Sequence, residues 1–210
     1  MYRMIPLMID LSDRTVVIFG GGNVGARKAA YFCREARVIV VSRSFSAAVK
    51  SLPVELVARD LGTIGESELE DFLTPAFIAV AATPDHAIND RIGRCCRRLG
   101  VLFDSVEGEP GDIAVPSVVR GDRYLLAIST EGRSPAVARF LREQIQTSWP
   151  LLDGMIGLQE RLRTELKEKV ASAEKRREIS RSVINDHAVW DALESGADMA
   201  WDLVEVRYLT

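Results

Sequence analysis

Three glycines at a fixed spacing are the residues of this chain best suited to binding a phosphate group. Gly20, Gly22 and Gly25 follow the apolar residues 16–19 and lead into a segment compatible with a helix. In such a pattern the first glycine permits a tight turn, the second lets the backbone approach a pyrophosphate, and the third lets the helix pack on the strand. The unpaired N–H groups at the helix N-terminus favour negative charge. The spacing therefore predicts a dinucleotide-binding site.

Further residues of this site follow from their positions after the predicted strands. Asn23 and Val24 lie inside the glycine pattern, at the start of the helix, and Arg43 and Ser44 follow the second strand. An NAD site commonly has an acid about 20 residues beyond the glycines, whereas an arginine with neighbouring hydroxyls suits the 2′-phosphate of NADP. No acid stands at residues 42–44, so the residues alone leave NAD and NADP open. Thr83, after the fourth strand, is expected to bond a ribose or phosphate oxygen.

The elements that position these residues alternate between strands and helices through the first half of the chain. Strand-like runs lie at 15–20, 37–42, 54–58, 77–82 and 101–104, and helix-like runs lie at 24–35, 66–72 and 87–99. Asp85 is the expected N-cap of the last of these helices, and Asn89 is expected to help hold the loop before it. This alternation predicts an α/β fold, a Rossmann-type doubly wound parallel sheet.

The pattern changes after Pro110 and Gly111. Residues 113–119 and 124–129 are β-rich runs joined across Gly121 and Asp122, which predicts a hairpin. Ser134 and Pro135 then open a helix that extends to about residue 148, and the rest of the chain is helical in pattern. We therefore predict an NAD(P)-binding domain at 1–112, a hairpin and helix at 113–148, and a small helical domain at 149–210.

The composition excludes several classes of protein. The 210 residues carry a formal net charge of -3, which argues against a general nucleic-acid or membrane-surface binder. No apolar run approaches the roughly 20 residues of a membrane span, and the N-terminus lacks a secretory leader pattern, so a cytoplasmic protein is expected. Three cysteines and two histidines, without CxxC spacing, predict no disulfide framework and no metal site.

Five ordered blocks carry a resemblance to a known family. They are Ile-Pro-Leu-Met-Ile-Asp-Leu at 5–11, Gly-Gly-Gly-Asn-Val-Gly-Ala-Arg-Lys-Ala at 20–29, Ala-Ala-Thr-Pro-Asp-His-Ala-Ile-Asn at 81–89, Val-Pro-Ser at 115–117 and Ile-Ser-Thr-Glu-Gly-Arg-Ser-Pro at 128–135. Together they resemble the precorrin-2 dehydrogenase family, which is also the N-terminal part of siroheme synthases. The resemblance covers about residues 2–148 and fits the helical tail more loosely.

The resemblance implies an activity and a set of partners. Members of that family oxidise precorrin-2 to sirohydrochlorin with NAD as homodimers, and some also insert ferrous iron. Family members often lack the acid after the second strand and still use NAD, so NAD is the expected cofactor, with NADP as the alternative. The hairpin and the helix after it are implied to form the dimer interface. No methyltransferase domain follows, so uroporphyrinogen methylation is expected to belong to another protein.

The substrate implied by the resemblance carries several carboxylates, which calls for cationic groups. Five arginines cluster in sequence around the hairpin and the following helix, at residues 120, 123, 133, 139 and 142. The forked donors of arginine suit paired carboxylates. Arg133 and Arg139, with Ser134 between them, are the expected substrate-binding residues.

One family residue is missing from this chain. The family has an aspartate beyond the fifth strand, in a segment resembling Asn-Val-x-Asp-x-Pro, and that position falls here on Gly108. Glycine has no side chain to take a proton or to bind iron. Glu107 and Glu109 flank it and Asp104 ends the preceding strand, so these three acids are the candidate catalytic residues. The alternative is that positioning alone suffices and water takes the proton.

Two functions from other classes stay open beside the dehydrogenase. A non-catalytic NAD(P)-sensing module would bind the cofactor without turnover of a tetrapyrrole. A tetrapyrrole-binding scaffold would bind sirohydrochlorin tightly with negligible oxidation. A dehydrogenase for another small substrate would leave the blocks at 115–117 and 128–135 without an explanation. Iron insertion is left open.

Overall fold

The structure, a computed structural model, describes residues 4–106 and 111–210. The chain forms two compact units, Met1–Val115 and Pro116–Thr210. Among the residues so described, no helix is both long and apolar enough to cross a membrane.

The first unit is built on a sheet of five parallel strands. These are β1 (Thr15–Phe19), β2 (Arg37–Ser42), β3 (Glu55–Ala58), β4 (Ala76–Ala81) and β5 (Leu102–Ser105), in the order β3-β2-β1-β4-β5. The central strands are rich in valine, isoleucine and alanine because both of their faces are buried. Strands β2 and β3 lie on one side of β1, and β4 and β5 lie on the other, so the strand order reverses between β1 and β4. In α/β sheets, ligands bind at the carboxyl ends of the strands beside such a reversal. The doubly wound sheet is confirmed.

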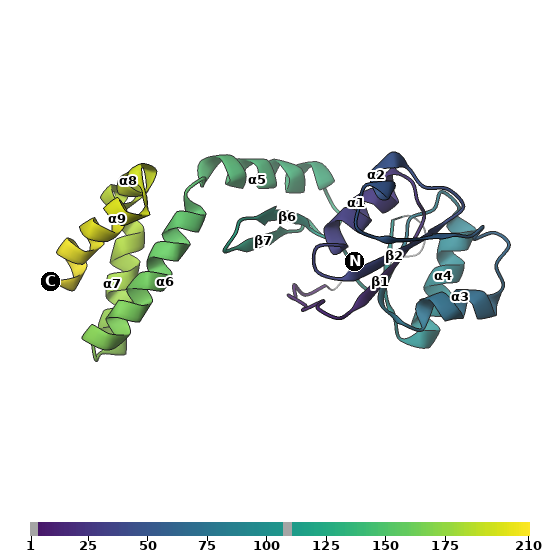
Figure 1. Ribbon diagram of the computed structural model, residues 1–210, viewed down its shortest axis with the longest axis horizontal. Helices are drawn as coiled ribbons and strands as arrows, with labels where there is room; N and C mark the ends of the chain where they lie inside the picture. The colour runs from purple at the N-terminus through teal and green to yellow at the C-terminus, as the bar shows by residue number, and fades with distance from the viewer. Residues whose placement is uncertain (1–3, 107–110) are drawn as a thin grey trace. The chain divides into compact units, whose positions relative to one another are not determined.

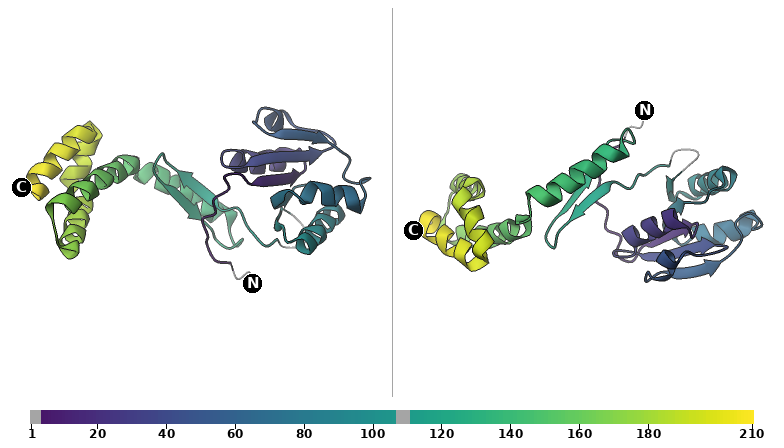
Figure 2. Two further views of the ribbon diagram at one scale, coloured as in Figure 1. Left: turned by 60° about the horizontal axis from the view of Figure 1, so that its bottom comes forward. Right: turned by 90° about the horizontal axis from the view of Figure 1, so that it is seen from above.

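Two helices cover each face of this sheet. They are α1 (Asn23–Phe32), α2 (Ala47–Lys50), α3 (Glu66–Leu73) and α4 (His86–Leu99). Alternate residues of each strand pack on opposite faces: Val16 and Ile18 pack against α1 and α2, whereas Val17 and Phe19 pack against α3 and α4. Figure 1 shows the resulting three layers of the first unit, and Figure 2 shows them from two further sides.

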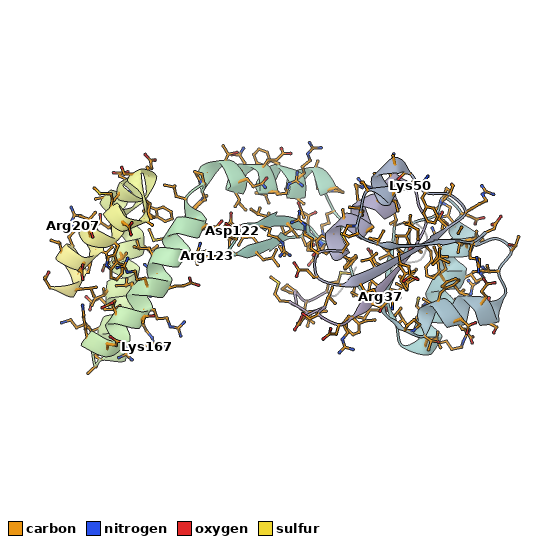
Figure 3. The ribbon with its side chains drawn as sticks, viewed as in Figure 1. Arg37, Lys50, Asp122, Arg123, Lys167 and Arg207 are labelled. Atoms are coloured by element: carbon orange, nitrogen blue, oxygen red, sulfur yellow. The ribbon has the colours of Figure 1, made fainter. Side chains whose placement is uncertain are left out.

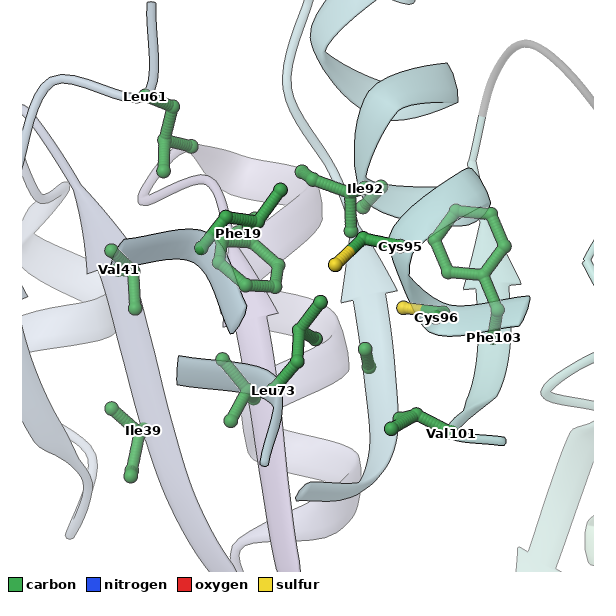
Figure 4. Packing of buried hydrophobic residues seen from close by; sticks show 14 of the residues in the cluster. Phe19, Ile39, Val41, Leu61, Leu73, Ile92, Cys95, Cys96, Val101 and Phe103 are labelled. Carbon is green, nitrogen blue, oxygen red and sulfur yellow. The ribbon is translucent and has the colours of Figure 1, made fainter. Parts of the chain in front are cut away.

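The core on the α3 and α4 side includes two cysteines. Cys95 and Cys96 of α4 are buried among Phe19, Leu73 and Phe103 (Figure 4). Burial raises the pKa of the Cys96 thiol to about 12. These thiols therefore act as small apolar side chains of the core.

Most of the local signals predicted from sequence are confirmed. Asp85 caps α4, where its Oδ1 accepts the N–H groups of Ala87 (2.9 Å) and Ile88 (3.2 Å). The helix α4 ends at Gly100, whose φ of 73° is the left-handed conformation that glycine adopts without strain. The short helix α2 was not predicted, because one turn capped by Ser46 is too short to show a helical period.

The second unit begins with the predicted hairpin and helix. Strands β6 (Ser117–Arg120) and β7 (Leu125–Ile128) pair antiparallel, and α5 (Pro135–Ser148) follows, with Ser134 as its cap. The prediction of a strand over 113–119 was wrong at its start. Residues 113 and 115 pack on the core of the first unit, and the N–H of Ile113 bonds to the carbonyl of Phe103 (3.1 Å).

The rest of the second unit is helical, as predicted. It contains α6 (Leu152–Lys169), α7 (Ala173–Asn185), α8 (His187–Ser195), α9 (Ala197–Val204) and the terminal turn η1 (Glu205–Leu209), packed around a core that includes Leu162 and Trp201. Asp186 joins three parts of it. Its carboxylate caps α8 and accepts bonds from Arg207 (2.8 Å) and from the Tyr208 hydroxyl (3.0 Å).

The tip of the hairpin is tied to α6. The carboxylate of Asp153 accepts the N–H groups of Asp122 (3.1 Å) and Arg123 (2.8 Å). Figure 3 labels both tip residues, which lie beside α6. A side chain on Gly121 would overlap the ring of Tyr124 and the Asp153 carboxylate, so a larger residue here would displace these two side chains. The hairpin and the helical part share one unit, and a domain boundary near residue 148 stays a prediction.

Candidate dinucleotide-binding site

The loop between β1 and α1 has the backbone that the glycine spacing predicts. Gly20 has a φ of 122°, and its N–H bonds to the carbonyl of Val41 (2.9 Å). A Cβ at this residue would overlap the carbonyl of Ala82, which follows β4. Only glycine combines this conformation with this close approach. The turn therefore lies at the carboxyl edge of the sheet, between β2 and β4.

The other two glycines of the pattern differ in what surrounds them. A Cβ on Gly25 would overlap the carbonyl oxygen of Gly20, so this glycine lets α1 pack closely on the turn. A Cβ on Gly22 would meet nothing within 4 Å. Gly22 is also the N-cap of α1 and offers no side-chain cap to the first turn, which contains Asn23 and Val24. Open space at an uncapped helix N-terminus fits a pyrophosphate.

The residues after β2 lie against this loop. A Cβ on Gly21 would overlap the carbonyl of Ser44, and the N–H of Ser46 bonds to the carbonyl of Gly21 (2.8 Å). Arg43 and Ser44 are therefore beside the glycine loop, where the ribose of adenosine lies in folds of this kind. The guanidinium of Arg43 is exposed, and its Nη1 is 3.7 Å from Oδ2 of Asp60.

Thr83 is held inside its own loop. Its hydroxyl is 2.7 Å from Oδ1 of Asn89 and accepts the N–H of Asp85 (3.2 Å). The Asn89 side chain is buried and donates to the carbonyl of Thr83 (3.0 Å), as expected of a residue that holds this loop. Because the Thr83 hydroxyl donates its proton within the loop, only its oxygen can serve a ligand, as the acceptor of a hydrogen bond from a ribose hydroxyl.

Asp104 is buried and paired. Its side chain at the end of β5 is 7% exposed, and its Oδ2 lies 2.5 Å from Nζ of Lys28 in α1. Sequence reasoning did not single out Lys28, because nothing in the sequence shows which lysine meets a residue 76 positions away. Removal of one partner of such a pair leaves a buried charge and costs about 3–5 kcal/mol. The other two candidate acids, Glu107 and Glu109, lie outside the described residues, as does Gly108.

The predicted substrate-binding residues lie in the second unit, around the start of α5. Arg133 and Ser134 line an open hollow of about 490 Å³, together with Ser129, Thr130, Glu131 and Val137. Ser134 Oγ accepts the N–H of Val137 (3.3 Å), which leaves its O–H to donate. Arg133 lies 3.4 Å from the Glu131 carboxylate.

Arg139 is not among the residues that line this hollow. Its Nε donates to the Glu143 carboxylate (2.8 Å) one turn along α5. This bond raises the pKa of Arg139 and lowers the pKa of Glu143. The structure therefore brings Arg133 and Ser134 together and leaves Arg139 apart from them.

A metal site is not evident among residues 4–106 and 111–210. No group of three or more histidine, cysteine, aspartate or glutamate side chains is arranged there to hold an ion.

Comparisons with known proteins place these features in a family. The model of the family described as "Putative NAD(P)-binding" matches residues 7–117. The precorrin-2 dehydrogenase of Methanosarcina barkeri is 38% identical over 211 residues, which cover 96% of this chain and 94% of that protein. The chain belongs to the precorrin-2 dehydrogenase family. The family predicted from the five sequence blocks is thus confirmed.

Two further comparisons agree with this membership. The siroheme synthase of Sodalis glossinidius is 32% identical over 184 residues, which cover 86% of this chain and 38% of that protein. The chain therefore spans less than half of the length of that relative. The solved structure of SirC, a precorrin-2 dehydrogenase, matches 96% of this chain and 99% of its own, with a TM-score of 0.72 and 22% identity. That match shows a shared fold across both units.

Proposed function

We propose that this chain oxidises precorrin-2 to sirohydrochlorin with NAD as the electron acceptor, as a homodimer. The observation that carries the proposal is the near full-length similarity to a precorrin-2 dehydrogenase, 38% identical over 96% of the chain. The open space at Gly22, in front of an uncapped helix, supports it because it fits the pyrophosphate of a nicotinamide dinucleotide.

The protein has mainly to position two large planar molecules. A bound nicotinamide supplies the chemistry, since it accepts the hydride that leaves a reduced carbon of the tetrapyrrole. The turn at Gly20 and the first turn of α1 hold the pyrophosphate, and Arg43 and Ser44 flank the adenosine ribose. Thr83 accepts a bond from a ribose hydroxyl. Such positioning supplies a large part of the rate in reactions of this kind.

The substrate also loses a ring proton, which needs an acceptor. Asp104 is held by Lys28, so a proton could reach its Oδ2 only after that contact separates. We therefore assign Asp104 to holding α1 against β5, and the proton to Glu107, Glu109 or water. Replacing both glutamates by glutamine should lower kcat more than KM if a glutamate is the acceptor. An unchanged kcat would assign the proton to water.

The carboxylates of the substrate fit the start of α5. The α5 N-terminus carries no acid in its first turn, and Arg133 and the O–H of Ser134 stand beside it. These groups favour a carboxylate by charge, by hydrogen bonding and by the helix dipole. Arg139 is the second cation in this proposal, once a substrate carboxylate replaces Glu143 as its partner. Replacing Arg133 by glutamate should raise KM for precorrin-2.

The homodimer is supported by an apolar stripe on α5. Val137, Phe140 and Leu141 are 47%, 57% and 40% exposed. Exposed apolar side chains at this spacing mark a helix face that a partner covers. We propose that two copies pair through this face, next to the hairpin.

The missing aspartate favours a second candidate, a protein that binds NAD(P) or a tetrapyrrole without turnover. The decisive experiment is an anaerobic assay in which precorrin-2 is generated in situ and sirohydrochlorin is followed with NAD, with NADP, and without cofactor. The dehydrogenase requires formation of sirohydrochlorin that depends on the cofactor. Cofactor binding without turnover would favour a sensor, and tight sirohydrochlorin binding without oxidation would favour a scaffold.

A further inference from the structure

The acid that an NAD site commonly has at the end of the second strand is missing after β2. We propose that Asp60, which follows β3, takes its place and makes this site select NAD over NADP. This inference rests on the proposed binding of a nicotinamide dinucleotide and names the residue that sets its specificity.

The pairing of β2 with β3 brings Asp60 to this position. Ser42 is level with Ala58 in the parallel ladder, and the N–H of Arg59 bonds to the carbonyl of Ser42 (3.1 Å), which extends the pairing by one residue. Arg43 is therefore level with Arg59, and Asp60 lies one residue further along. The side chains of Arg43 and Asp60 nevertheless meet, with Oδ2 of Asp60 3.7 Å from Nη1 of Arg43.

The Asp60 carboxylate is fixed by its own turn. Its Oδ1 accepts the N–H of Gly62 (3.0 Å), and its carbonyl accepts the N–H groups of Thr63 (3.0 Å) and Ile64 (3.2 Å). The carboxylate therefore does not depend on Arg43 to hold its position.

The turn is also anchored to the rest of the first unit. Leu61 and Ile64 are buried in the core beneath α3 and α4. Arg91 of α4 donates to the carbonyls of Leu61 (2.6 Å) and Ile64 (3.2 Å). A carboxylate on an anchored turn can act on a ligand without first being ordered.

Arg59 lies between Arg43 and Asp60 in the sequence, but its side chain forms an ion pair away from both of them. Its Nε donates to the Glu68 carboxylate of α3 (2.9 Å). The cation at the carboxyl end of β2 is therefore Arg43, and Asp60 stands beside it. A 2′-phosphate bound by Arg43 would meet the negative charge of Asp60, whereas the 2′-hydroxyl of NAD can donate to a carboxylate.

The experiment is a fluorescence titration of NADH and of NADPH with the full chain. The test variant is Asp60→Asn, which keeps an oxygen to accept the Gly62 N–H and removes the charge. The control is Glu55→Gln. Glu55 forms an ion pair with Arg37 (2.6 Å) at the opposite, amino ends of the same two strands, so the control removes an equal charge from an equivalent pair.

We expect the unmodified protein to bind NADH about tenfold more tightly than NADPH, which is the size of a like-charge effect across a solvated site. Asp60→Asn should tighten NADPH binding about tenfold and weaken NADH binding, because an amide is a poorer acceptor for the 2′-hydroxyl than a carboxylate. Adding Arg43→Ala to Asp60→Asn should remove that gain. Glu55→Gln should leave the ratio of the two dissociation constants unchanged.

Three results would overturn the inference. The first is equal binding of NADH and NADPH by the unmodified protein. The second is an Asp60→Asn variant with the same ratio of dissociation constants as Glu55→Gln. Both would leave the proposed dehydrogenase standing, because the cofactor still binds. The third, no binding of either nucleotide, would overturn the cofactor site and the specificity together.

Discussion

Replacing Gly22 by alanine separates folding from cofactor binding more sharply than other changes in the glycine loop. Gly22 faces open space, so the added methyl group meets nothing within 4 Å in the protein itself. The same methyl group would stand where we place the pyrophosphate. The variant should therefore fold and lose affinity for the cofactor.

The magnitudes follow from the position of this residue. At an N-cap the change from glycine to alanine costs about 0.5–1 kcal/mol, which lowers the melting temperature of a unit of this size by only a few degrees. Hydrogen bonds from the first turn of α1 to a charged phosphate are worth about 1.5–3 kcal/mol each. Loss of one of them weakens NADH binding by about tenfold to a hundredfold.

Gly25→Ala provides the comparison. A Cβ on Gly25 overlaps the backbone carbonyl of Gly20, so this variant should lose about 3 kcal/mol of folding free energy as well as cofactor affinity. Thermal unfolding and NADH titration on both variants measure the two effects. If Gly22→Ala binds NADH as the unmodified protein does, the pyrophosphate does not lie at this loop.

Three further predictions concern other parts of the chain. Because burial raises the pKa of Cys96 to about 12, a thiol reagent at neutral pH should label Cys33 and reach the two buried cysteines only after unfolding; rapid labelling of all three would contradict this packing. Asp186→Ala should lower the free energy of unfolding of the second unit by about 2 kcal/mol in urea, through loss of a helix cap and of the Tyr208 bond; an unchanged value would contradict this. Phe140→Glu should convert the proposed dimer to a monomer in sedimentation, and a persistent dimer would assign the interface elsewhere.

Asp186 also predicts a dependence of stability on pH. Burial opposes its ionisation, but the Tyr208 hydroxyl, the Ala188 N–H and Arg207 outweigh burial and lower its pKa. A carboxyl whose pKa is lower in the folded state stabilises the fold above its unfolded pKa, and this contribution is lost as the pH falls through the folded pKa. The second unit should therefore become easier to unfold below about pH 4. Asp186→Ala should show a weaker loss over the same range.

The sheet and its cofactor loop were predictable because their signals are local. Strands β1 and β2 are runs of apolar residues, largely β-branched, and Gly20, Gly22 and Gly25 stand at fixed spacing after the first of them. The cap of α4 by Asp85 is also local, since the carboxylate and the N–H groups that it accepts are two and three residues apart.

The error at the start of β6 has a clear physical reason. Residues 113–115 are apolar and suit a strand, but Pro116 lacks the N–H that a ladder needs. The segment before the proline instead packs on the first unit, and the hairpin starts at Ser117. Pro116 therefore indicates where the hairpin begins, which the apolar pattern of residues 113–119 alone does not show.

The contacts that give individual side chains their roles were not predictable. Lys28 with Asp104 and Arg43 with Asp60 are pairs brought together by strand order and register, not by sequence spacing. The bonds of Asp153 to the hairpin tip are of the same kind. The sequence therefore predicted the backbone of the glycine loop, while the proposed choice of cofactor and the proposed role of each acid depend on tertiary contacts.

The stoichiometry of the anaerobic reaction shows directly whether this protein oxidises precorrin-2 with a nicotinamide cofactor. Sirohydrochlorin and NADH should appear in equal amounts when precorrin-2 and NAD are supplied to the unmodified protein. Gly22→Ala, at a cofactor concentration that saturates only the unmodified protein, should produce much less of both. Sirohydrochlorin that forms equally fast without a nicotinamide cofactor, or with Gly22→Ala, would contradict the account.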